Sequence, residues 1–245
     1  MFSCKSLKHY IRQNRDDAQK TIQTLYQINS EIFDAFMQSK NNKIDLECAD
    51  LIIESIIYLL KYDSAFLKKA MPYFTDDNLI KNHSLHVAVY ALVIGNILKF
   101  KDDDLQKIGL AALLHDIGLK KIDENIINKK SLLTAKEISV MQKHSRYGVE
   151  MIEQNKIHDP YVIDAIMHHH ERYDGSGYPN QLTIDEISDF ASILAICDVF
   201  DALTNNRPYR EHFTSFNALK MMMKEEDMVK KFNQKYLHLF LKSFL

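Results

Sequence analysis

The sequence predicts an all-α protein, and three observations support that prediction. Gly and Pro are scarce, at 6 and 4 of 245 residues, which favours long helices with few tight turns. Apolar residues recur at helical spacing along most of the chain, and no segment alternates convincingly with period two between turn signals. A hydrophobic content of 46% with 26% charged residues is ordinary for a globular protein that buries a sizeable core.

The expected helices follow one another with recognisable start signals. Thr134 with Glu137 and Thr183 with Glu186 match the capping box, and Asp159 before Pro160 matches an N-cap followed by proline. In order, the expected helices cover residues 7–38 (one or two helices), 44–70, 75–100, 102 to the LLHDIG segment, 134–154, 159 to the histidine triplet, 190–203, and two more within 215–245. The break at 41–43 places a boundary between an N-terminal helical segment, 1–44, and a domain, 45–245.

Composition excludes several classes of protein. The net charge of −2 gives no reason to expect a broad nucleic-acid surface, so DNA is not an expected partner. Cys4, Cys48 and Cys197 are odd in number and lack close spacing, which argues against a disulfide framework or a cysteine zinc site and favours a reducing compartment. Without an apolar run of signal-peptide or membrane-spanning length, a soluble cytoplasmic protein is expected, with no membrane contact.

Histidine is unusually frequent, with 11 residues, and several recur with aspartates where helices end or pass through apolar surroundings. A lone histidine on an apolar helix face is usually a hydrogen-bonded core residue, but a joint set of this size is hard to assign to coincidence. Imidazole and carboxylate without thiolate suit Fe, Mn, Ni, Co or Zn. The set comprises His83, His115, Asp116, His144, His168, His169, His170 and Asp198.

The segment LAALLHDIGL carries His115 and Asp116 into surroundings that should be buried. Burying an unpaired carboxylate is costly, which implies a metal or another cation beside it. Neighbouring helical residues point about 100° apart, so two adjacent ligands reach one metal only near a helix end, or flank a pair of metals. Asp116 is then the natural bridge between two metals.

Four segments, HSLHV (83–87), LLHDIG (113–118), HHERYDGSGYP (169–179) and ICDVFDALTNNRPYR (196–210), resemble the HD-GYP family over about residues 45–235. These are HD-superfamily phosphohydrolases that degrade cyclic di-GMP, so the resemblance implies an HD-superfamily helical bundle with an N-terminal helical extension. It also implies two metal sites that share Asp116. The first set is His83, His115, Asp116 and Asp198, and the second is Asp116, His144, His169 and His170, which leaves His168 outside both.

The resemblance implies two divalent ions. We expect Fe or Mn, with Ni, Co or Zn as alternatives. A third-metal ligand position of some members is occupied here by Leu79. Metal coordination lowers the pKa of water, so a bridging hydroxide would attack one phosphodiester of cyclic di-GMP and yield pGpG, with GMP after a second cleavage. Asp116 and His115 are the expected catalytic residues.

Expected substrate contacts are Arg207, Arg210, Lys120, Tyr178 and Gly177. Leu119 stands where the family usually has a phosphate-contacting lysine, which leaves two alternatives open. One is a cyclic-dinucleotide receptor or a module that contacts diguanylate cyclase-type proteins through the Gly-Tyr-Pro loop. The other is an HD hydrolase of another nucleotide phosphoester. A homodimer is a further expectation.

Overall fold

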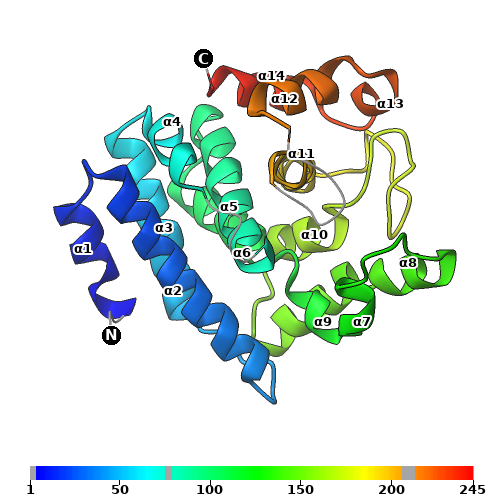
Figure 1. Ribbon diagram of the computed structural model, residues 1–245, viewed down its shortest axis with the longest axis horizontal. Coiled ribbons are helices and arrows are strands. Elements are labelled where there is room, and N and C mark those ends of the chain that lie inside the picture. Colours follow the sequence, from blue (N-terminus) through cyan, green and yellow to red (C-terminus); the bar gives the residue numbers. More distant parts are fainter. Residues whose placement is uncertain (1–3, 75–78, 206–212, 245) are drawn as a thin grey trace. The chain divides into compact units, whose positions relative to one another are not determined.

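The computed structural model describes residues 4–74, 79–205 and 213–244, and these are largely helical (Figure 1). Apart from an isolated bridge between Asp174 and Thr183, the described residues form no strand, so the all-α prediction is confirmed. The α-helices are α1 (Leu7–Gln13), α2 (Ala18–Gln38), α3 (Leu46–Tyr62), α4 (Phe66–Ala70), α5 (Leu79–Ile97), α6 (Asp102–Leu114), α7 (Glu124–Ile127), α8 (Ala135–Met141), α9 (His144–Gln154), α10 (Pro160–His168), α11 (Asp189–Thr204), α12 (Ser215–Lys224), α13 (Glu226–Val229) and α14 (Gln234–Lys242). The 3-10 helices are η1 (Cys4–Ser6), η2 (Met71–Tyr73) and η3 (Ile117–Lys121).

The chain forms two compact units. Unit 1 comprises Met1–Leu113 and Leu239–Leu245, and unit 2 comprises Leu114–His238. Residues 1–44 therefore share a unit with 45–113, and the boundary expected near residue 44 stays a prediction. Unit 2 contains the segment HHERYDGSGYP, the segment LLHDIG from its second leucine onward, and most of the metal-ligand candidates.

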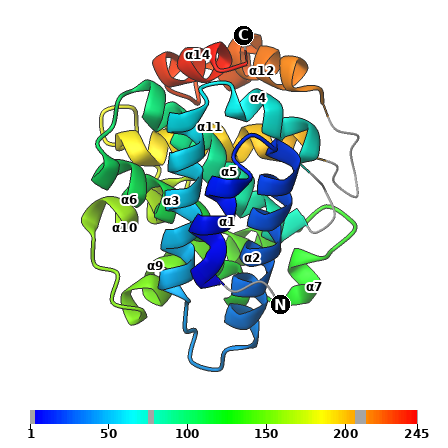
Figure 2. The same cartoon turned by 90° about the vertical axis from the view of Figure 1, so that its left-hand side faces the viewer.

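Unit 1 is built on helices that begin at aspartate caps. The side chain of Asp17 accepts a hydrogen bond from the Lys20 amide at the start of α2, and Asp45 does the same for Cys48 at the start of α3. Contacts join α2 to α3 and α1 to α3, and Figure 2 shows these helices next to one another. The apolar stripes predicted from the spacing are buried: Ile22, Leu25, Ile28, Ile52, Ile56 and Leu59 are at most 1% exposed.

Two expectations for unit 1 are wrong. The helix expected over 44–70 is interrupted after Tyr62, because Asp63 is extended and its carboxylate accepts from the Ala65 amide, a local bond that competes with the helix. Cys4 and Cys48 are joined by a disulfide, although the cysteine spacing argued against one. The pairing links η1 to α3 across a sequence separation of 44, which spacing alone does not reveal.

Unit 2 packs η3 and α10 against α9, and α10 against α11. The capping box at Thr134 is present, but the helix expected to run to residue 154 breaks after Met141, and His144 starts a new helix. Thr183 and Glu186 do exchange hydrogen bonds, yet they close a turn, and the Ser188 side chain caps α11 instead. Three α-helices, rather than two, occupy the described part of 215–245.

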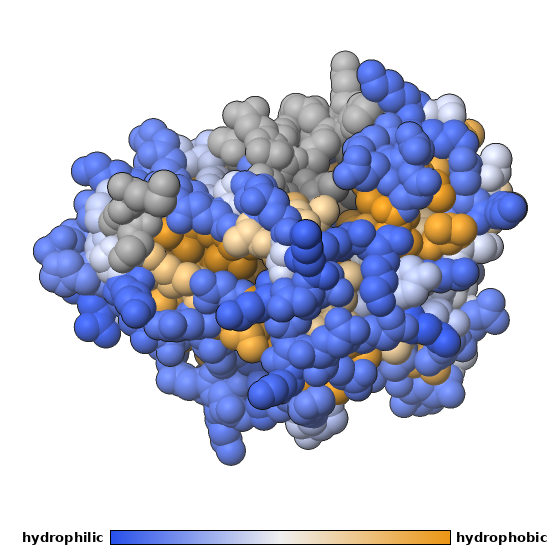
Figure 3. Space-filling view, turned by 90° about the horizontal axis from the view of Figure 1, so that it is seen from below, coloured by the Kyte–Doolittle hydropathy of each residue, from blue (hydrophilic) through white to orange (hydrophobic). Residues whose placement is uncertain are grey.

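No helix within the described ranges is long and apolar enough to cross a membrane. The face in Figure 3 is mostly hydrophilic, with hydrophobic side chains in separate patches.

Candidate metal centre

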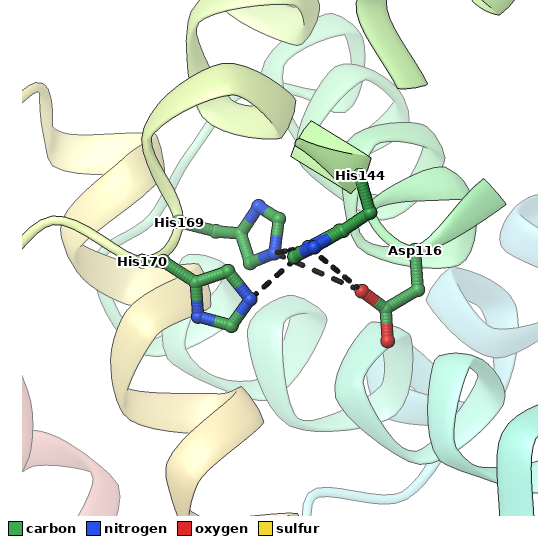
Figure 4. A group of neighbouring side chains, drawn as sticks. All are labelled: Asp116, His144, His169 and His170. Atoms are coloured by element: carbon green, nitrogen blue, oxygen red, sulfur yellow. Dashed lines mark hydrogen bonds and ion pairs between the residues drawn. The ribbon is translucent and has the colours of Figure 1, made fainter. Parts of the chain in front are cut away.

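Four predicted ligands converge within unit 2 (Figure 4). One ligand atom from each of Asp116, His144, His169 and His170 lies within 4.8 Å of all the others. His144 Nε2 is central: it lies 3.3 Å from His169 Nε2, 3.1 Å from His170 Nε2 and 3.3 Å from Asp116 Oδ1. Two nitrogens bound to one tetrahedral ion at about 2.0–2.1 Å would lie about 3.3 Å apart, so these separations suit a shared cation.

Helix ends orient two of these imidazoles. His144 Nδ1 lies 2.8 Å from the carbonyl oxygen of Met141, at the point where α8 ends. His169 Nδ1 lies 2.8 Å from the carbonyl oxygen of Ile166, in the last turn of α10. Because a carbonyl only accepts, both Nδ1 atoms carry the proton, and the carbonyls freed at the helix ends fix the ring planes. Each Nε2 is thereby directed into the cluster.

Burial keeps the inner imidazoles unprotonated. Burial, followed by the neighbouring His115 and His144, lowers the pKa of His169 to about 3. Burial and then the neighbouring His169 also hold the pKa of His170 well below its usual range. Metal ions bind neutral imidazole, so both rings are in the ligand form at neutral pH. The donor set fits a divalent cation.

Asp116 reaches the cluster because the chain leaves α6 just before it. The helix ends at Leu114, and Asp116 precedes η3. Asp116 Oδ1 faces His144, while Asp116 Oδ2 lies 3.5 Å from His115 Nε2. The two carboxylate oxygens therefore face different imidazoles, as the expectation of a bridging carboxylate requires.

His115 and Asp198 lie beside the four-residue cluster. A ring nitrogen of His115 and a carboxylate oxygen of Asp198 lie within 4.8 Å of each other. Asp198 Oδ2 is also 3.6 Å from His170 Nδ1. Both residues are buried, so unit 2 gathers six of the seven predicted ligands in one region.

Gly118 explains why the segment reads His-Asp-Ile-Gly. A Cβ at this residue would overlap the backbone carbonyl of His144 and crowd the amide of Gly148. Only glycine lets η3 approach α9 this closely. The close approach brings Asp116, two residues earlier, beside His144.

The Gly-rich turn beside the histidines is held by Glu171, a residue to which the sequence assigned no role. Its carboxylate, 1% exposed, accepts hydrogen bonds from the amides of Asn180 (2.6 Å) and Leu182 (3.0 Å). Gly177 is buried, and a Cβ there would overlap the backbone of residues 171–172. Gly175 adopts φ +74°, a left-handed conformation that favours glycine. The sequence signal that could have pointed to Glu171 is its position, directly after His169 and His170 and just before the Gly-rich turn.

This turn carries Tyr178 to the cluster. The Tyr178 ring stacks on His170 with centroids 4.6 Å apart and meets His144 edge-on at 6.2 Å. Burial raises the pKa of the Tyr178 hydroxyl, so it stays protonated. The neighbouring Arg172 guanidinium donates hydrogen bonds to the carbonyl oxygens of His169 and Glu171.

His168 stands apart from the cluster. Its Nδ1 lies 2.8 Å from Asp164 Oδ1, and its Nε2 lies 3.1 Å from the Asn180 side chain. Within the histidine triplet, His169 and His170 lie inside the cluster and His168 lies outside it, while their roles as ligands stay a prediction.

The remaining residues predicted from the sequence lie outside this four-residue cluster. His83 lies on α5 in unit 1, and its role as a ligand stays a prediction. Arg207 and Arg210 lie outside the described residues. Lys120 lies in η3, and burial lowers its pKa, but its contact with a substrate stays a prediction.

A cavity of ≈ 430 Å³ adjoins this region within unit 2. Its walls are the start of α9, with Lys143, Arg146 and Tyr147, and the turn that carries Gly177 and Tyr178. None of these lining residues except Tyr178 and Gly177 was singled out from the sequence.

An all-α unit with clustered imidazoles and carboxylates defines a helical protein of the kind that holds divalent metal ions. The family model described as HD domain matches residues 69–232. The chain belongs to the HD domain family, and divalent metal binding follows from that membership together with the cluster. The resemblance seen in the sequence is confirmed at this level.

Known relatives extend the comparison. A cyclic di-GMP phosphodiesterase of Pseudomonas aeruginosa is 34% identical over 174 residues, 71% of this chain and 42% of the relative. A 3′3′-cGAMP-specific phosphodiesterase of Vibrio cholerae is 37% identical over 145 residues, 59% of this chain and 28% of the relative. The cyclic di-GMP phosphodiesterase response regulator RpfG of Xanthomonas campestris is 40% identical over 129 residues, 52% of this chain and 34% of the relative. The chain spans less than half the length of each of these relatives.

Among solved structures, an HDG"Y"P protein from Bdellovibrio bacteriovorus matches with a TM-score of 0.69. The match covers 97% of this chain and 79% of the other at 18% identity, and it supports the fold assignment.

Proposed function

We propose that the protein is a metal-dependent phosphodiesterase that hydrolyses cyclic di-GMP, or a related cyclic dinucleotide, to the linear dinucleotide. The observation that carries the proposal is the convergence of Asp116, His144, His169 and His170 on one point. Relatives named as phosphodiesterases of cyclic di-GMP and of 3′3′-cGAMP support the substrate class.

In this proposal Asp116, His144, His169 and His170 hold one divalent ion, and a second ion is held by Asp116 with His115, Asp198 and His83, as expected from the sequence. Fe or Mn is the proposed metal. When bound, divalent ions lower the pKa of water and neutralise charge on phosphoryl oxygens. The chain's own residues keep the imidazoles unprotonated by burial and orient them through the Met141 and Ile166 carbonyls.

Tyr178 covers one side of His170, so it limits access of water and shapes the side from which a nucleotide arrives. Its pKa is raised by burial, which makes it a hydrogen-bond donor to an incoming phosphate rather than an anion that would repel it. Contact with a diguanylate cyclase-type protein through the residues 174–179 turn, and homodimer formation, stay predictions.

The experiment is anaerobic purification with metal analysis, followed by assays of cyclic di-GMP and 3′3′-cGAMP hydrolysis on the same sample. Bound Fe or Mn and turnover to linear dinucleotide are expected, with turnover abolished in Asp116→Asn. Tight nucleotide binding without turnover at full metal occupancy would instead favour the receptor alternative. Faster turnover of a mononucleotide ester than of either cyclic dinucleotide would favour the alternative of an HD hydrolase that acts on another nucleotide phosphoester.

A further inference from the structure

The cavity beside α9, lined by Lys143, Arg146 and Tyr147 together with the turn residues Gly177 and Tyr178, has no role in the metal centre. We call it the α9 cavity. Its volume of ≈ 430 Å³ lies within the range of small-molecule sites, about 300–1,000 Å³. Gln142, Ser176, Pro179 and Gln181 complete its described lining, which therefore contains no carboxylate. The charged side chains of this lining, Lys143 and Arg146, are both positive.

The cations of the α9 cavity are not neutralised by their surroundings. Lys143 and Arg146 are exposed, and neither forms an ion pair with a carboxylate of the described ranges. Lys121 nearby contrasts with them, because its ammonium lies 2.6 Å from Glu150. Glu150, four residues after Arg146 on α9, is thus engaged by Lys121, and two adjacent cations in a lining without a described acidic residue favour an anionic ligand.

A larger cavity in unit 1, of ≈ 570 Å³, provides a comparison. Its lining includes Lys8 and Lys61, but Lys8 pairs with Glu54 and Lys61 pairs with Asp102. Its third cation, Arg12, lies over the Tyr58 ring, and the lining also carries Asp50, Glu54 and Asp102, so its charges balance and it shows no comparable demand for an anion. Size alone does not select the site, whereas an excess of positive charge in the lining does.

Helical spacing places both cations on one flank of α9. Residues three apart on a helix are neighbours, so Lys143 and Arg146 can hold one anion between them. His144, one residue after Lys143, is turned by about 100° and enters the metal cluster. An arginine fork beside a lysine ammonium suits the oxygens of a phosphate.

Tyr178 links the α9 cavity to the metal cluster. It lines the cavity, and the same ring stacks on His170 at 4.6 Å and meets His144 at 6.2 Å. A ligand in the cavity therefore lies next to the side chains that would hold the metal ion at which the phosphate reacts. Such a ligand is most simply another part of the same substrate.

We propose that the α9 cavity binds the phosphate of a cyclic dinucleotide that is not being cleaved, with Lys143 and Arg146 as its cations. This inference rests on the proposed function, because a cyclic dinucleotide carries two phosphodiesters and the metal cluster takes only one. The second phosphate keeps its negative charge throughout the reaction and needs a cationic partner. Lys143 and Arg146 then determine affinity for substrates with two phosphates.

The test uses the full chain loaded with Mn²⁺ and two substrates. Cyclic di-GMP has two phosphodiesters, and bis(p-nitrophenyl) phosphate has one. The variants are Lys143→Ala, Arg146→Ala and the double variant, and Lys136→Ala is a matched control on α8, exposed and outside the cavity. Since one exposed ion pair is worth up to about fivefold in affinity, the loss of both in the double variant should lower the ratio of kcat/KM for cyclic di-GMP to that for the small diester by about tenfold.

The effect should be a higher KM for cyclic di-GMP rather than a lower kcat. Because salt screens the charges, raised salt should reduce the difference in this KM between wild type and the double variant. Equal losses on both substrates, or no loss on either, would overturn the proposal. A Lys136→Ala control that lowers the ratio as much as the double variant does would also overturn it. If metal-loaded wild type hydrolyses neither substrate, the proposed function fails, and calorimetric titration with cyclic di-GMP decides the subsite. A Kd about tenfold weaker in the double variant supports it, and an equal Kd or no binding by wild type overturns it.

Discussion

Gly118 and His144 are in backbone contact: a Cβ at residue 118 would overlap the His144 carbonyl oxygen. Because this contact brings η3 against α9, it also sets the position of Asp116 relative to His144. Asp116 Oδ1 lies 3.3 Å from His144 Nε2. One glycine thus joins two parts of the metal cluster that come from segments far apart in the sequence.

Gly118→Ala should therefore both destabilise unit 2 and weaken metal binding. The expected loss is about 3 kcal/mol, the upper end of the cost of overpacking, because backbone atoms cannot move aside as a side chain can. Chemical denaturation and metal titration of the purified variant would measure the two effects. Gly148→Ala is the matched control, since its Cβ would lie closest to the Ile166 side chain, at 3.1 Å, and would meet backbone atoms of Gly118 and His115 only at an ordinary van der Waals distance of 3.7 Å. Equal losses in the two variants would contradict this role for Gly118.

The histidine triplet predicts a contrast between neighbours. His169→Ala should weaken metal affinity by more than about 100-fold, beyond the range found for residues that only support a ligand. His168→Ala should retain the metal, because its ring bonds to Asp164 and Asn180 outside the cluster. Metal content after dialysis against a weak chelator would separate them. Similar metal loss in both variants would place His168 among the ligands.

Glu137 predicts a pH dependence of stability. Hydrogen bonds from Lys129, and then from the Thr134 amide and hydroxyl, lower its pKa from 4.5 to about 2 in the folded chain. The folded state thus favours the carboxylate, and the contribution of Glu137 to stability is complete above pH 4.5 and is lost as pH falls towards 2. The difference in unfolding free energy between wild type and Glu137→Gln should accordingly shrink between pH 6 and pH 2.

Urea denaturation of the metal-free protein at several pH values would measure this difference. Lys129→Ala removes the largest cause of the shift, so in that background the effect of Glu137→Gln should depend less on pH. If the difference in unfolding free energy between wild type and Glu137→Gln stays constant down to pH 2, the lowered pKa of Glu137 is refuted.

Glu171→Gln should loosen the turn that carries Tyr178. The variant keeps one acceptor oxygen, but its amide NH₂ faces one of the two backbone N–H groups now bonded to the carboxylate. Leaving a buried donor unpaired costs about 1–3 kcal/mol. Hydrogen exchange at the amides of Asn180 and Leu182 should speed up, while that of α2 in unit 1 should not. Unchanged exchange at both amides would show that the carboxylate does not hold the turn.

The sequence predicted local features well wherever neighbouring residues decide them. The cap of Asp159 on α10 and the capping box of Thr134 on α8 are present as expected, because each depends on atoms two or three residues apart. The same kind of signal at Thr183 failed, since Ser188 offers a competing cap closer to the apolar run of α11. Asp63 ended a helix that apolar spacing alone would have continued.

The sequence by itself determined the all-α class and the identity of the clustered histidines and aspartates, because helical periodicity and residue chemistry are local properties. Only the tertiary structure decided which backbone carbonyls orient His144 and His169, how Glu171 holds the turn, and that Cys4 meets Cys48. It also decided that Lys143 and Arg146 meet no carboxylate of the described residues beside Tyr178, while Lys121 meets Glu150. These relationships depend on where separate helices end and pack, and no spacing along the chain encodes that.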